Sequence, residues 1–306
     1  MIKITFLGTS AGVPTPTRNV SALALQPSDS KRWMLFDCGE GTQHRLMQTS
    51  LSPYHLERIF ISHLHGDHVY GLFGLLASRG MSRAETPLDI YGPKGLQEML
   101  GCVMRLSQLN LPFALRTHEV SAADRLTFDG FSVDVVALSH SITSFGYVLR
   151  FANRPGHFDV LKAKELGIPE GPLYGRLKRG ERIELEGGRV IDGKDLVGPP
   201  SKGPVIAVGG DNDDPLLFAP YAPLDLLIHE ATYTQEDFDR LERKFKHTTA
   251  KNLGIAAQKM GVNTLIFTHI SPRYDEKGVE KLKKEIQTHF KGRVIAAKDL
   301  MEFEWS

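Results

Sequence analysis

The chain is organised around six residues, His63-Leu64-His65-Gly66-Asp67-His68. The apolar run at residues 58–62 predicts a buried strand, and residues 69–79 predict a helix that begins at the end of that strand. In an extended backbone His63 and His65 project to the same side, and the chain can bend freely at Gly66. Three histidines and an aspartate therefore gather in one tight strand-to-helix turn.

Imidazole nitrogens and carboxylate oxygens are ligands that suit zinc and its first-row relatives. His63 and His65 supply one pair of ligands, and Asp67 and His68 supply a second pair, which predicts two neighbouring cations. The alternative is a polar surface loop that holds histidines by chance. Four such residues within six positions at a strand end argue against that alternative.

Composition limits the class of protein. The 306 residues are 41% hydrophobic and 24% charged, which is enough to build one large domain or two smaller ones. Since 37 basic residues balance 36 acidic ones, the overall charge predicts no polyanion partner. Any nucleic-acid site must come from local patches of charge.

Cysteine usage and the first residues indicate the compartment. The two cysteines, Cys38 and Cys102, form no CxxC pair, so we expect no disulfide framework and a reducing cytoplasm. The first six residues alternate like a strand and lack the features of a signal peptide. No segment approaches the ~20 apolar residues of a membrane span. We therefore expect a cytoplasmic protein with no membrane partner.

The first half of the chain is rich in strands with few helices between them, which predicts a mixed sheet. Strands are expected there at residues 2–7, 20–25, 33–36, 58–62, 88–91, 113–120, 131–138 and 145–151. Helices are expected up to about residue 47, over 69–79 and over 93–106. The second half alternates strands at 204–208, 224–228, 264–267 and 293–297 with two helices. These helices run from Thr248 or Thr249 to about 261 and over 276–290.

The segment between the halves, residues 153–203, is rich in glycine, proline and charge. A disordered linker is one interpretation, but apolar residues favour a small ordered excursion. Those apolar residues are Leu161, Leu166, Leu173, Leu177 and Ile183. Just beyond Gly171-Pro172 lies a cluster of cations: Arg176, Lys178, Arg179 and Arg182.

Further ligand types follow other apolar strands. His140, Asp211, His229 and His269 are each expected at the carboxyl end of a strand, where ligands gather in layered α/β folds. Asp37 ends another strand and has two open interpretations. It either orients a ligand histidine or caps a turn.

The central motif resembles the HxHxDH signature of the metallo-β-lactamase-fold hydrolases. Nearly the whole chain resembles the ribonuclease Z family, the tRNA 3′-processing endonucleases. The blocks that carry this resemblance are Phe6-Leu7-Gly8-Thr9-Ser10-Ala11-Gly12-Val13-Pro14, Arg18-Asn19, Leu35-Phe36-Asp37-Cys38-Gly39-Glu40-Gly41-Thr42-Gln43, His65-Gly66-Asp67-His68-Val69-Tyr70-Gly71-Leu72, His229-Glu230-Ala231-Thr232 and His247-Thr248-Thr249. The resemblance implies an αββα sandwich of two mixed sheets flanked by helices. It also implies one domain over residues 1–306, with an inserted flexible arm at 153–203 that binds tRNA.

The resemblance further implies two zinc ions per subunit, with manganese or cobalt as alternative metals. The ligands of the first ion would be His63, His65, His140 and Asp211. The ligands of the second ion would be Asp67, His68, Asp211 and His269.

One block departs from the family pattern. Members usually have Gly-Asp-Thr, whereas this chain has Gly210-Asp211-Asn212 followed by Asp213 and Asp214. Asp213 or Asp214 could replace Asp211 as the bridging ligand. We favour Asp211 because it directly follows the predicted strand and a Gly-Gly turn.

The activity implied by the resemblance is endonucleolytic removal of the 3′ trailer from precursor tRNA. The tRNA would keep a 3′-hydroxyl and the trailer a 5′-phosphate. Asp67 is the expected proton acceptor, and His247, paired with Glu230, is the expected general acid. For His247, capping or packing at a helix start remains an alternative. The partners implied are precursor tRNA, no DNA, and a second subunit in a homodimer.

Two competing functions remain open. The chain could be another hydrolase of the same fold, such as a small-molecule phosphodiesterase or a thioester or sulfate-ester hydrolase. The long arm and its Gly-Pro element argue against this interpretation. A zinc-stabilised RNA-binding module is the non-enzyme alternative, but structural zinc sites are closed and usually contain cysteines.

Overall fold

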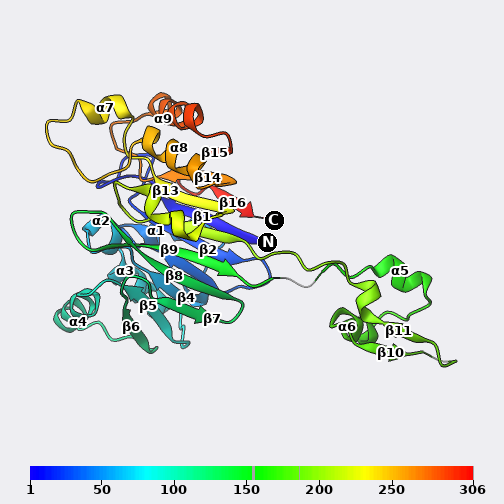
Figure 1. Cartoon of the computed structure of the whole chain (residues 1–306). Coiled ribbons are helices and arrows are strands. Elements are labelled where there is room, and N and C mark those ends of the chain that lie inside the picture. Colours follow the sequence, from blue (N-terminus) through cyan, green and yellow to red (C-terminus); the bar gives the residue numbers. More distant parts are fainter. Residues whose placement is uncertain (154–155, 186, 306) are drawn as a thin grey trace. The chain divides into compact units, whose positions relative to one another are not determined.

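The computed structural model describes residues 1–153, 156–185 and 187–305 (Figure 1). The expected arm at 153–203 therefore contains positions 154, 155 and 186, which lie outside the described residues. Among the described residues, no helix has the length and apolar character needed to cross a membrane. The chain divides into a main unit, made of Met1–Thr127, Ser132–Leu149 and Val205–Ser306, and an arm unit, made of Phe128–Phe131 and Arg150–Pro204.

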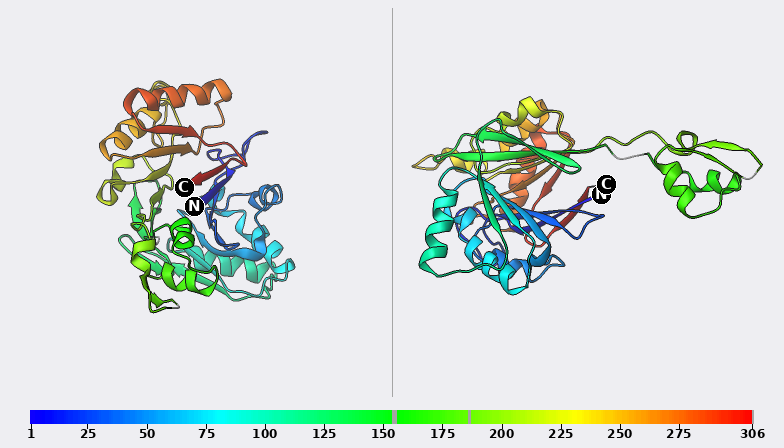
Figure 2. Two further views of the ribbon diagram at one scale, coloured as in Figure 1. Left: turned by 90° about the vertical axis from the view of Figure 1, so that its right-hand side faces the viewer. Right: turned by 90° about the horizontal axis from the view of Figure 1, so that it is seen from below.

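The first sheet of the main unit has seven strands in the order β16-β1-β2-β3-β4-β5-β6. Its strands are β1 (Ile2–Gly8), β2 (Ala22–Pro27), β3 (Trp33–Phe36), β4 (Leu56–Phe60), β5 (Leu88–Gly92), β6 (Leu115–Glu119) and β16 (Glu302–Trp305). Neighbours from β3 to β6 run parallel, whereas β1 pairs antiparallel with β2 and β16. Because β1 pairs with β16, the two ends of the chain lie side by side (Figure 2).

The second sheet also has seven strands, in the order β15-β14-β13-β12-β9-β8-β7. Its strands are β7 (Arg125–Phe128), β8 (Phe131–Leu138), β9 (Ser144–Phe151), β12 (Val205–Val208), β13 (Leu226–Glu230), β14 (Thr264–Thr268) and β15 (Arg293–Ala296). The four strands from β12 to β15 run parallel, so their carboxyl ends meet at one edge.

Helices cover the outer face of each sheet. The helices over the first sheet are α1 (Thr42–Leu46), α2 (Gly66–Val69), α3 (Leu72–Met81) and α4 (Leu96–Leu106), with the 3-10 turn η1 (Pro53–His55). Those over the second sheet are α7 (Gln235–Asp239), α8 (Ala250–Lys259) and α9 (Glu276–His289), with η3 (Pro215–Tyr221). Buried side chains of α3 and α4 pack on β3, β4 and β5, and those of α8 and α9 pack on β13 and β14.

The inner faces of the two sheets meet through aromatic rings. Tyr147 lies with its ring centroid 5.2 Å from that of Phe60 and 6.1 Å from that of Phe36. Its hydroxyl donates to the carbonyl oxygen of Ile61 at 2.6 Å, which ties the sheets together directly beside the central motif. The main unit is therefore an αββα sandwich of two mixed sheets, as the resemblance of the sequence motifs implies.

Four details of the main unit differ from the elements expected. The short strands β7 and β16 and the helix α7 were not anticipated, because four or five residues carry too little periodicity. The helix expected at 69–79 is instead two helices, α2 and α3, separated at Gly71. A Cβ at Gly71 would lie 2.0 Å from the carbonyl oxygen of Gly39, so this close approach requires glycine.

The arm unit has a core of its own. It contains α5 (Val160–Glu165), α6 (Pro172–Lys178), β10 (Arg182–Glu184), β11 (Val190–Asp192) and η2 (Gly193–Leu196). Of the apolar residues expected to order it, four join this core, namely Leu166, Leu173, Leu177 and Ile183, whereas Leu161 is exposed. Much of its expected cationic cluster is paired: Arg176 and Arg179 both bind Glu181, and Arg182 binds Asp192.

Candidate metal centre

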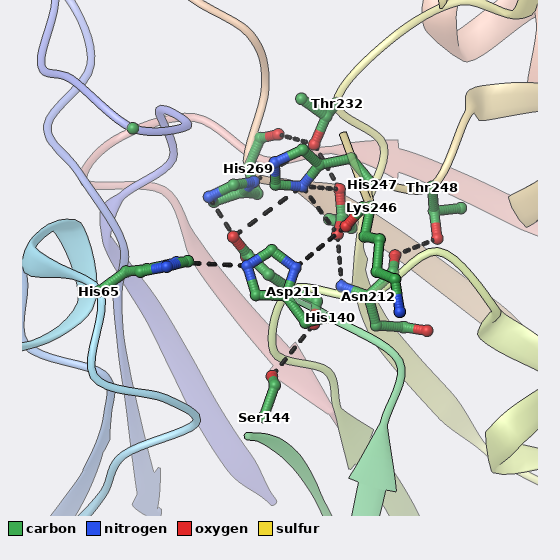
Figure 3. Close-up of polar contacts among 12 residues, drawn as sticks. His65, His140, Ser144, Asp211, Asn212, Thr232, Lys246, His247, Thr248 and His269 are labelled. Atoms are coloured by element: carbon green, nitrogen blue, oxygen red, sulfur yellow. Dashed lines mark hydrogen bonds and ion pairs between the residues drawn. The ribbon is translucent and has the colours of Figure 1, made fainter. Parts of the chain in front are cut away.

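Five elements bring the expected ligands together, and Figure 3 labels four of these residues, namely His65, His140, Asp211 and His269. The motif histidine His63 follows β4, and α2 begins just after His65, so that its first turn carries Asp67 and His68. The other three residues follow the ends of β8, β12 and β14; they are His140, Asp211 and His269. The two sheets thus place side chains from distant parts of the sequence around a common point.

Three histidines form the first group. Nε2 of His63 lies 3.0 Å from Nδ1 of His65, and Nε2 of His140 lies 3.2 Å from the same Nδ1. Burial lowers the pKa of His63 well below its usual value and also lowers the pKa of His140. Both imidazoles are therefore neutral at pH 7, the state in which a ring nitrogen can bind a cation.

The second group contains Asp67, His68, Asp211 and His269. Nε2 of His68 lies 3.3 Å from an oxygen of Asp67 and 3.5 Å from an oxygen of Asp211. Burial would raise the pKa of Asp67, but neighbouring His68 and a hydrogen bond with His269 lower it far below its usual range. This carboxylate is therefore ionised at neutral pH.

The two oxygens of Asp211 face the two groups separately. Oδ1 lies 3.2 Å from Nε2 of His269, whereas Oδ2 lies 3.8 Å from Nε2 of His63. This arrangement suits a bridging ligand. Among the described residues, neither Asp213 nor Asp214, the two alternatives to Asp211, joins a ligand group. Asp214 instead caps η3 by accepting from the backbone N–H of Leu216.

The surroundings of His68 test whether a cation fits. Its Nδ1 lies 2.7 Å from an oxygen of Asp37, a contact that orients the ring. Burial opposes a charge on His68, but the carboxylates of Asp211, Asp37 and Asp67 raise the pKa of this imidazole well above its usual value. The Nε2 of His68 is buried, forms no hydrogen bond, and faces the carboxylates of Asp67 and Asp211. Carboxylates gathered around this nitrogen stabilise positive charge, so a metal ion that displaces the imidazole proton fits here, and the imidazole and carboxylate donors suit zinc. Asp37 is expected either to orient a ligand histidine or to cap a turn. The contact with His68 agrees with the first of these roles.

A third group lies beside the second and includes His247. Nδ1 of His247 lies 3.1 and 3.3 Å from the two oxygens of Glu230 and 3.9 Å from Oδ2 of Asp211. Burial opposes a charge here, but the Glu230 carboxylate raises the pKa of His247 to about 9. The His247–Glu230 pair expected from the sequence is therefore present, with the ring protonated at neutral pH.

His229 occupies a different place from the one expected. β13 extends to Glu230, so His229 lies within the strand and is fully buried. Its Nε2 lies 2.6 Å from the side-chain nitrogen Nδ2 of Asn212, and its Nδ1 lies 2.9 Å from the backbone carbonyl oxygen of Glu230. Both ring nitrogens have partners, and His229 joins no ligand group among the described residues.

Other residues around the groups escaped the sequence analysis. The backbone N–H of Gly12, in a turn that has no charged side chain to mark it, donates to Asp67 at 2.9 Å. The hydroxyl of Ser62 donates to Asp37 at 2.9 Å, and Thr248 donates to the carbonyl oxygen of Asn212 at 2.6 Å. These small residues carry no local signal, because only the fold brings them beside the ligands.

Comparison with known proteins places the chain. A ribonuclease Z from Brevibacillus brevis is 43% identical over 299 residues, which cover 96% of this chain and 94% of that one. A ribonuclease Z from Bacillus velezensis is 40% identical over 305 residues, 98% of each chain. The chain belongs to the ribonuclease Z family.

Solved structures agree with this membership. The short form of human tRNase Z is 29% identical, with a TM-score of 0.69, over 99% of this chain and 98% of that one. The metallo-beta-lactamase fold protein YhfI from Bacillus subtilis, 20% identical over 99% of each chain, has a TM-score of 0.68 and shows the fold alone. The metallo-β-lactamase fold expected of a ribonuclease Z is thereby confirmed.

A family model described as anti-Pycsar protein Apyc1 matches residues 2–157. That stretch holds the central motif and His140 but ends before Asp211, His247 and His269. The ribonuclease Z relatives span both parts of the site.

Members of all three groups line a cavity of about 400 Å³ in this ribonuclease Z chain. Its walls include the motif residues His65 and Asp67, the bridging candidate Asp211, and His247. This cavity would therefore bring the bound cations, the carboxylate of Asp67 and the protonated imidazole of His247 around one substrate.

Proposed function

We propose that the chain is a zinc-dependent endoribonuclease that removes the 3′ trailer from precursor tRNA. The tRNA keeps a 3′-hydroxyl, and the trailer carries a 5′-phosphate. The observation that supports this most is the convergence of seven donor residues, five of which line one cavity, in a chain 43% identical to a ribonuclease Z over 96% of its length.

Two zinc ions occupy the two groups in this proposal. The first is held by His63, His65, His140 and Asp211, and the second by Asp67, His68, Asp211 and His269. When bound, two such ions lower the pKa of a water molecule and stabilise negative charge on the attacking and leaving oxygens. Manganese or cobalt are alternative occupants, since the same donors accept them.

Asp67 and His247 carry the protons. Asp67 is ionised, and its Oδ2 accepts from the backbone of Gly12, which orients the carboxylate while it takes a proton from the attacking water. On the other side of the cavity, protonated His247 donates to the departing ribose oxygen, which is a poor leaving group without a proton. Glu230 holds His247 in its charged form and fixes Nδ1, so that Nε2 is free to donate.

The arm unit holds the body of the tRNA in this proposal. Its separate core supports the idea, because an independently packed unit can bind RNA without disturbing the catalytic residues. RNA is bound through shape and phosphates, so base identity need not be read. We further propose that the chain acts as a homodimer in which the arm of one subunit serves the site of the other.

We place this activity in the cytoplasm. Both cysteines are free thiols, Cys38 buried and Cys102 exposed, which fits a reducing compartment.

The deciding experiment incubates the purified, zinc-loaded chain with a 3′-extended precursor tRNA and maps both product ends. We expect one cut that leaves a 3′-hydroxyl and a 5′-phosphate, and two zinc ions per chain by elemental analysis. A small phosphodiester assayed in parallel tests the competing hydrolase. Turnover of the small diester with no cleavage of precursor tRNA would reject the proposal. Tight RNA binding with one metal and no cleavage would favour the binding module.

A further inference from the structure

One wall of the catalytic cavity has no part in the chemistry proposed so far. It is built by residues 243–246, which we call the basic-aromatic segment, and by Tyr233 from the loop after β13. The segment reads Arg243-Lys244-Phe245-Lys246 and is exposed along its whole length. It connects α7 to α8 and leads directly into His247.

The basic-aromatic segment is tied to the candidate metal centre. The Nδ1 of His140 lies 3.1 Å from the carbonyl oxygen of Lys246 (Figure 3). The Nζ of Lys246 lies 3.4 Å from the hydroxyl of Ser139. The carbonyl of Phe245 also accepts from the backbone of His247 at 2.9 Å. These bonds hold the segment beside the reacting groups.

Two aromatic rings in this wall are each accompanied by an arginine. Phe245 is 48% exposed, and the guanidinium of Arg243 lies 5.5 Å from its ring centroid. The ring of Tyr233 lies 6.3 Å from that of His247, with the guanidinium of Arg273 at 5.0 Å from the tyrosine ring. Phe245 is exposed, whereas Tyr233 is half-buried. Accessible aromatic rings flanked by cations are the features with which proteins stack the bases of single-stranded nucleic acid.

The cations of this wall keep their charge available, although the Nζ of Lys244 donates to the carbonyl oxygen of Phe238. A hydrogen bond from Tyr274 and the nearby charge of Arg273 also lower the pKa of Asp237. Among the described residues, no carboxylate forms an ion pair with Arg243, Lys244, Lys246 or Arg273. By contrast, Arg240 in the turn before the segment is paired with Glu236. The unpaired cations supply charge for the phosphates on either side of a stacked base.

The proposed reaction determines which nucleotide lies here. Cleavage that leaves a 3′-hydroxyl makes the O3′ of the last retained nucleotide the departing atom. The proton donor to that oxygen, His247, must lie next to it. The base attached to the same ribose is therefore the one within reach of Tyr233 and Phe245.

We propose that Phe245 and Tyr233 form a stacking subsite for the last retained base of the tRNA. Arg243 and Arg273 support the two rings and balance the adjoining phosphates. The subsite accepts any base, since every base has a flat face, but it requires that a base be present. This inference rests on the proposed ribonuclease function and assigns the side of the cut on which the enzyme holds a base.

The test compares Phe245→Ala and Phe245→Leu with the unaltered chain on three precursor tRNAs. One RNA is intact, one lacks the base of the last retained nucleotide, and one lacks the base of the first trailer nucleotide. Tyr54→Ala is the matched control, because Tyr54 is a similarly exposed aromatic (44%) outside the cavity. The readout is kcat/KM, with zinc content measured for each variant.

Both Phe245 variants should cleave the intact RNA with a kcat/KM lower on the order of tenfold. The same loss should occur on the RNA that lacks the trailer base. The RNA that lacks the retained base should already be a poor substrate, and the variants should lower its rate no further. Tyr54→Ala should behave like the unaltered chain.

Three outcomes would overturn the subsite. They are no loss on the intact RNA, an equal loss on all three RNAs, and a loss that disappears only when the trailer base is missing. Failure of the unaltered chain to cleave any of these RNAs would instead refute the proposed function, so the two failures are distinguishable.

Discussion

Asp211 shows how much of the site depends on single residues. Its two oxygens face different groups of histidines, and the residue is buried, with 4% of its surface exposed. Burial would raise the pKa of Asp211, but His269 and His68 lower it well below its usual range. The residue is therefore an anion held where two cations are proposed to meet.

We predict that Asp211→Ala removes at least one metal ion per chain and abolishes cleavage, because each proposed ion loses a ligand. Elemental analysis after gel filtration measures the metal, and a gel assay on precursor tRNA measures the rate. Asp213→Ala is the control and should keep both ions. Full metal content in Asp211→Ala would contradict the bridging role.

His247 and its partner give a second prediction at this scale. His247→Ala should slow cleavage of an ordinary RNA linkage by about 10²–10⁴-fold, since the departing ribose oxygen needs a proton. A substrate with a nitrophenolate leaving group needs no such proton and should lose far less. Comparing kcat/KM on the two substrates measures this difference. An equal loss of kcat/KM on both substrates would mean that His247 has a structural role and is not the general acid.

The charge of His247 can be measured directly. The folded pKa of about 9 lies above the ordinary value of 6.5 because Glu230 stabilises the imidazolium. The pair therefore stabilises the fold fully below about pH 6.5, and this contribution disappears as the pH rises through 9. We predict that NMR titration of the metal-free chain places the His247 transition near 9. Glu230→Gln should move it downwards, because burial then dominates, and an unmoved transition would exclude Glu230 as the cause.

At the scale of elements, the site is built where strand ends and helix starts meet. Asp37 follows β3 and accepts from the backbone N–H of Ser62, which follows the neighbouring strand β4, at 2.7 Å. The same carboxylate holds Nδ1 of His68 in α2. Pairing of β3 with β4 thus orients a ring in the helix that begins within the central motif.

We predict that Asp37→Ala weakens binding of one zinc ion by about 10–100-fold, as expected for loss of the partner that orients a ligand histidine. Competition with a chelator of known affinity measures this loss. The ion held by His63, His65 and His140 should be affected less, so the two binding steps should separate. Unchanged binding of both ions would mean that packing alone orients His68.

For the whole molecule, the division into two units separates substrate capture from chemistry in our proposal. All the ligand candidates lie in the main unit, whereas the arm unit has its own core. The backbone of Gly203 donates to the side chain of Asn153 at 3.1 Å, so the two ends of the arm already lie close together.

We predict that joining Asn153 directly to Gly203, with residues 154–202 removed, spares turnover of a small phosphodiester and destroys cleavage of precursor tRNA. The main unit keeps both sheets and both helical cores, so its fold should survive. Rates on the two substrates and the zinc content provide the comparison. Equal loss on both substrates would show that the segment is required for the fold of the catalytic unit.

The sequence by itself determined the ligand candidates, because ligands at strand ends are signalled by short local patterns. Its residue pattern indicated a mixed sheet, whereas the sandwich followed from the resemblance of its motifs to a known family. His63 to His68 need only one turn, and His140, Asp211 and His269 each directly follow an apolar run. Alternation of apolar residues also located most of the strands, since it reflects burial of one face.

Tertiary structure decided which candidates meet. His229 follows the same kind of apolar run as His269, yet β13 continues through it and both its ring nitrogens bond within the protein. Gly12, Ser62 and the basic-aromatic segment reach the site only through contacts between residues far apart in the chain. A local sequence pattern indicates the chemistry that a residue can perform. The residues that lie beside it in space are determined by the packing of the two sheets.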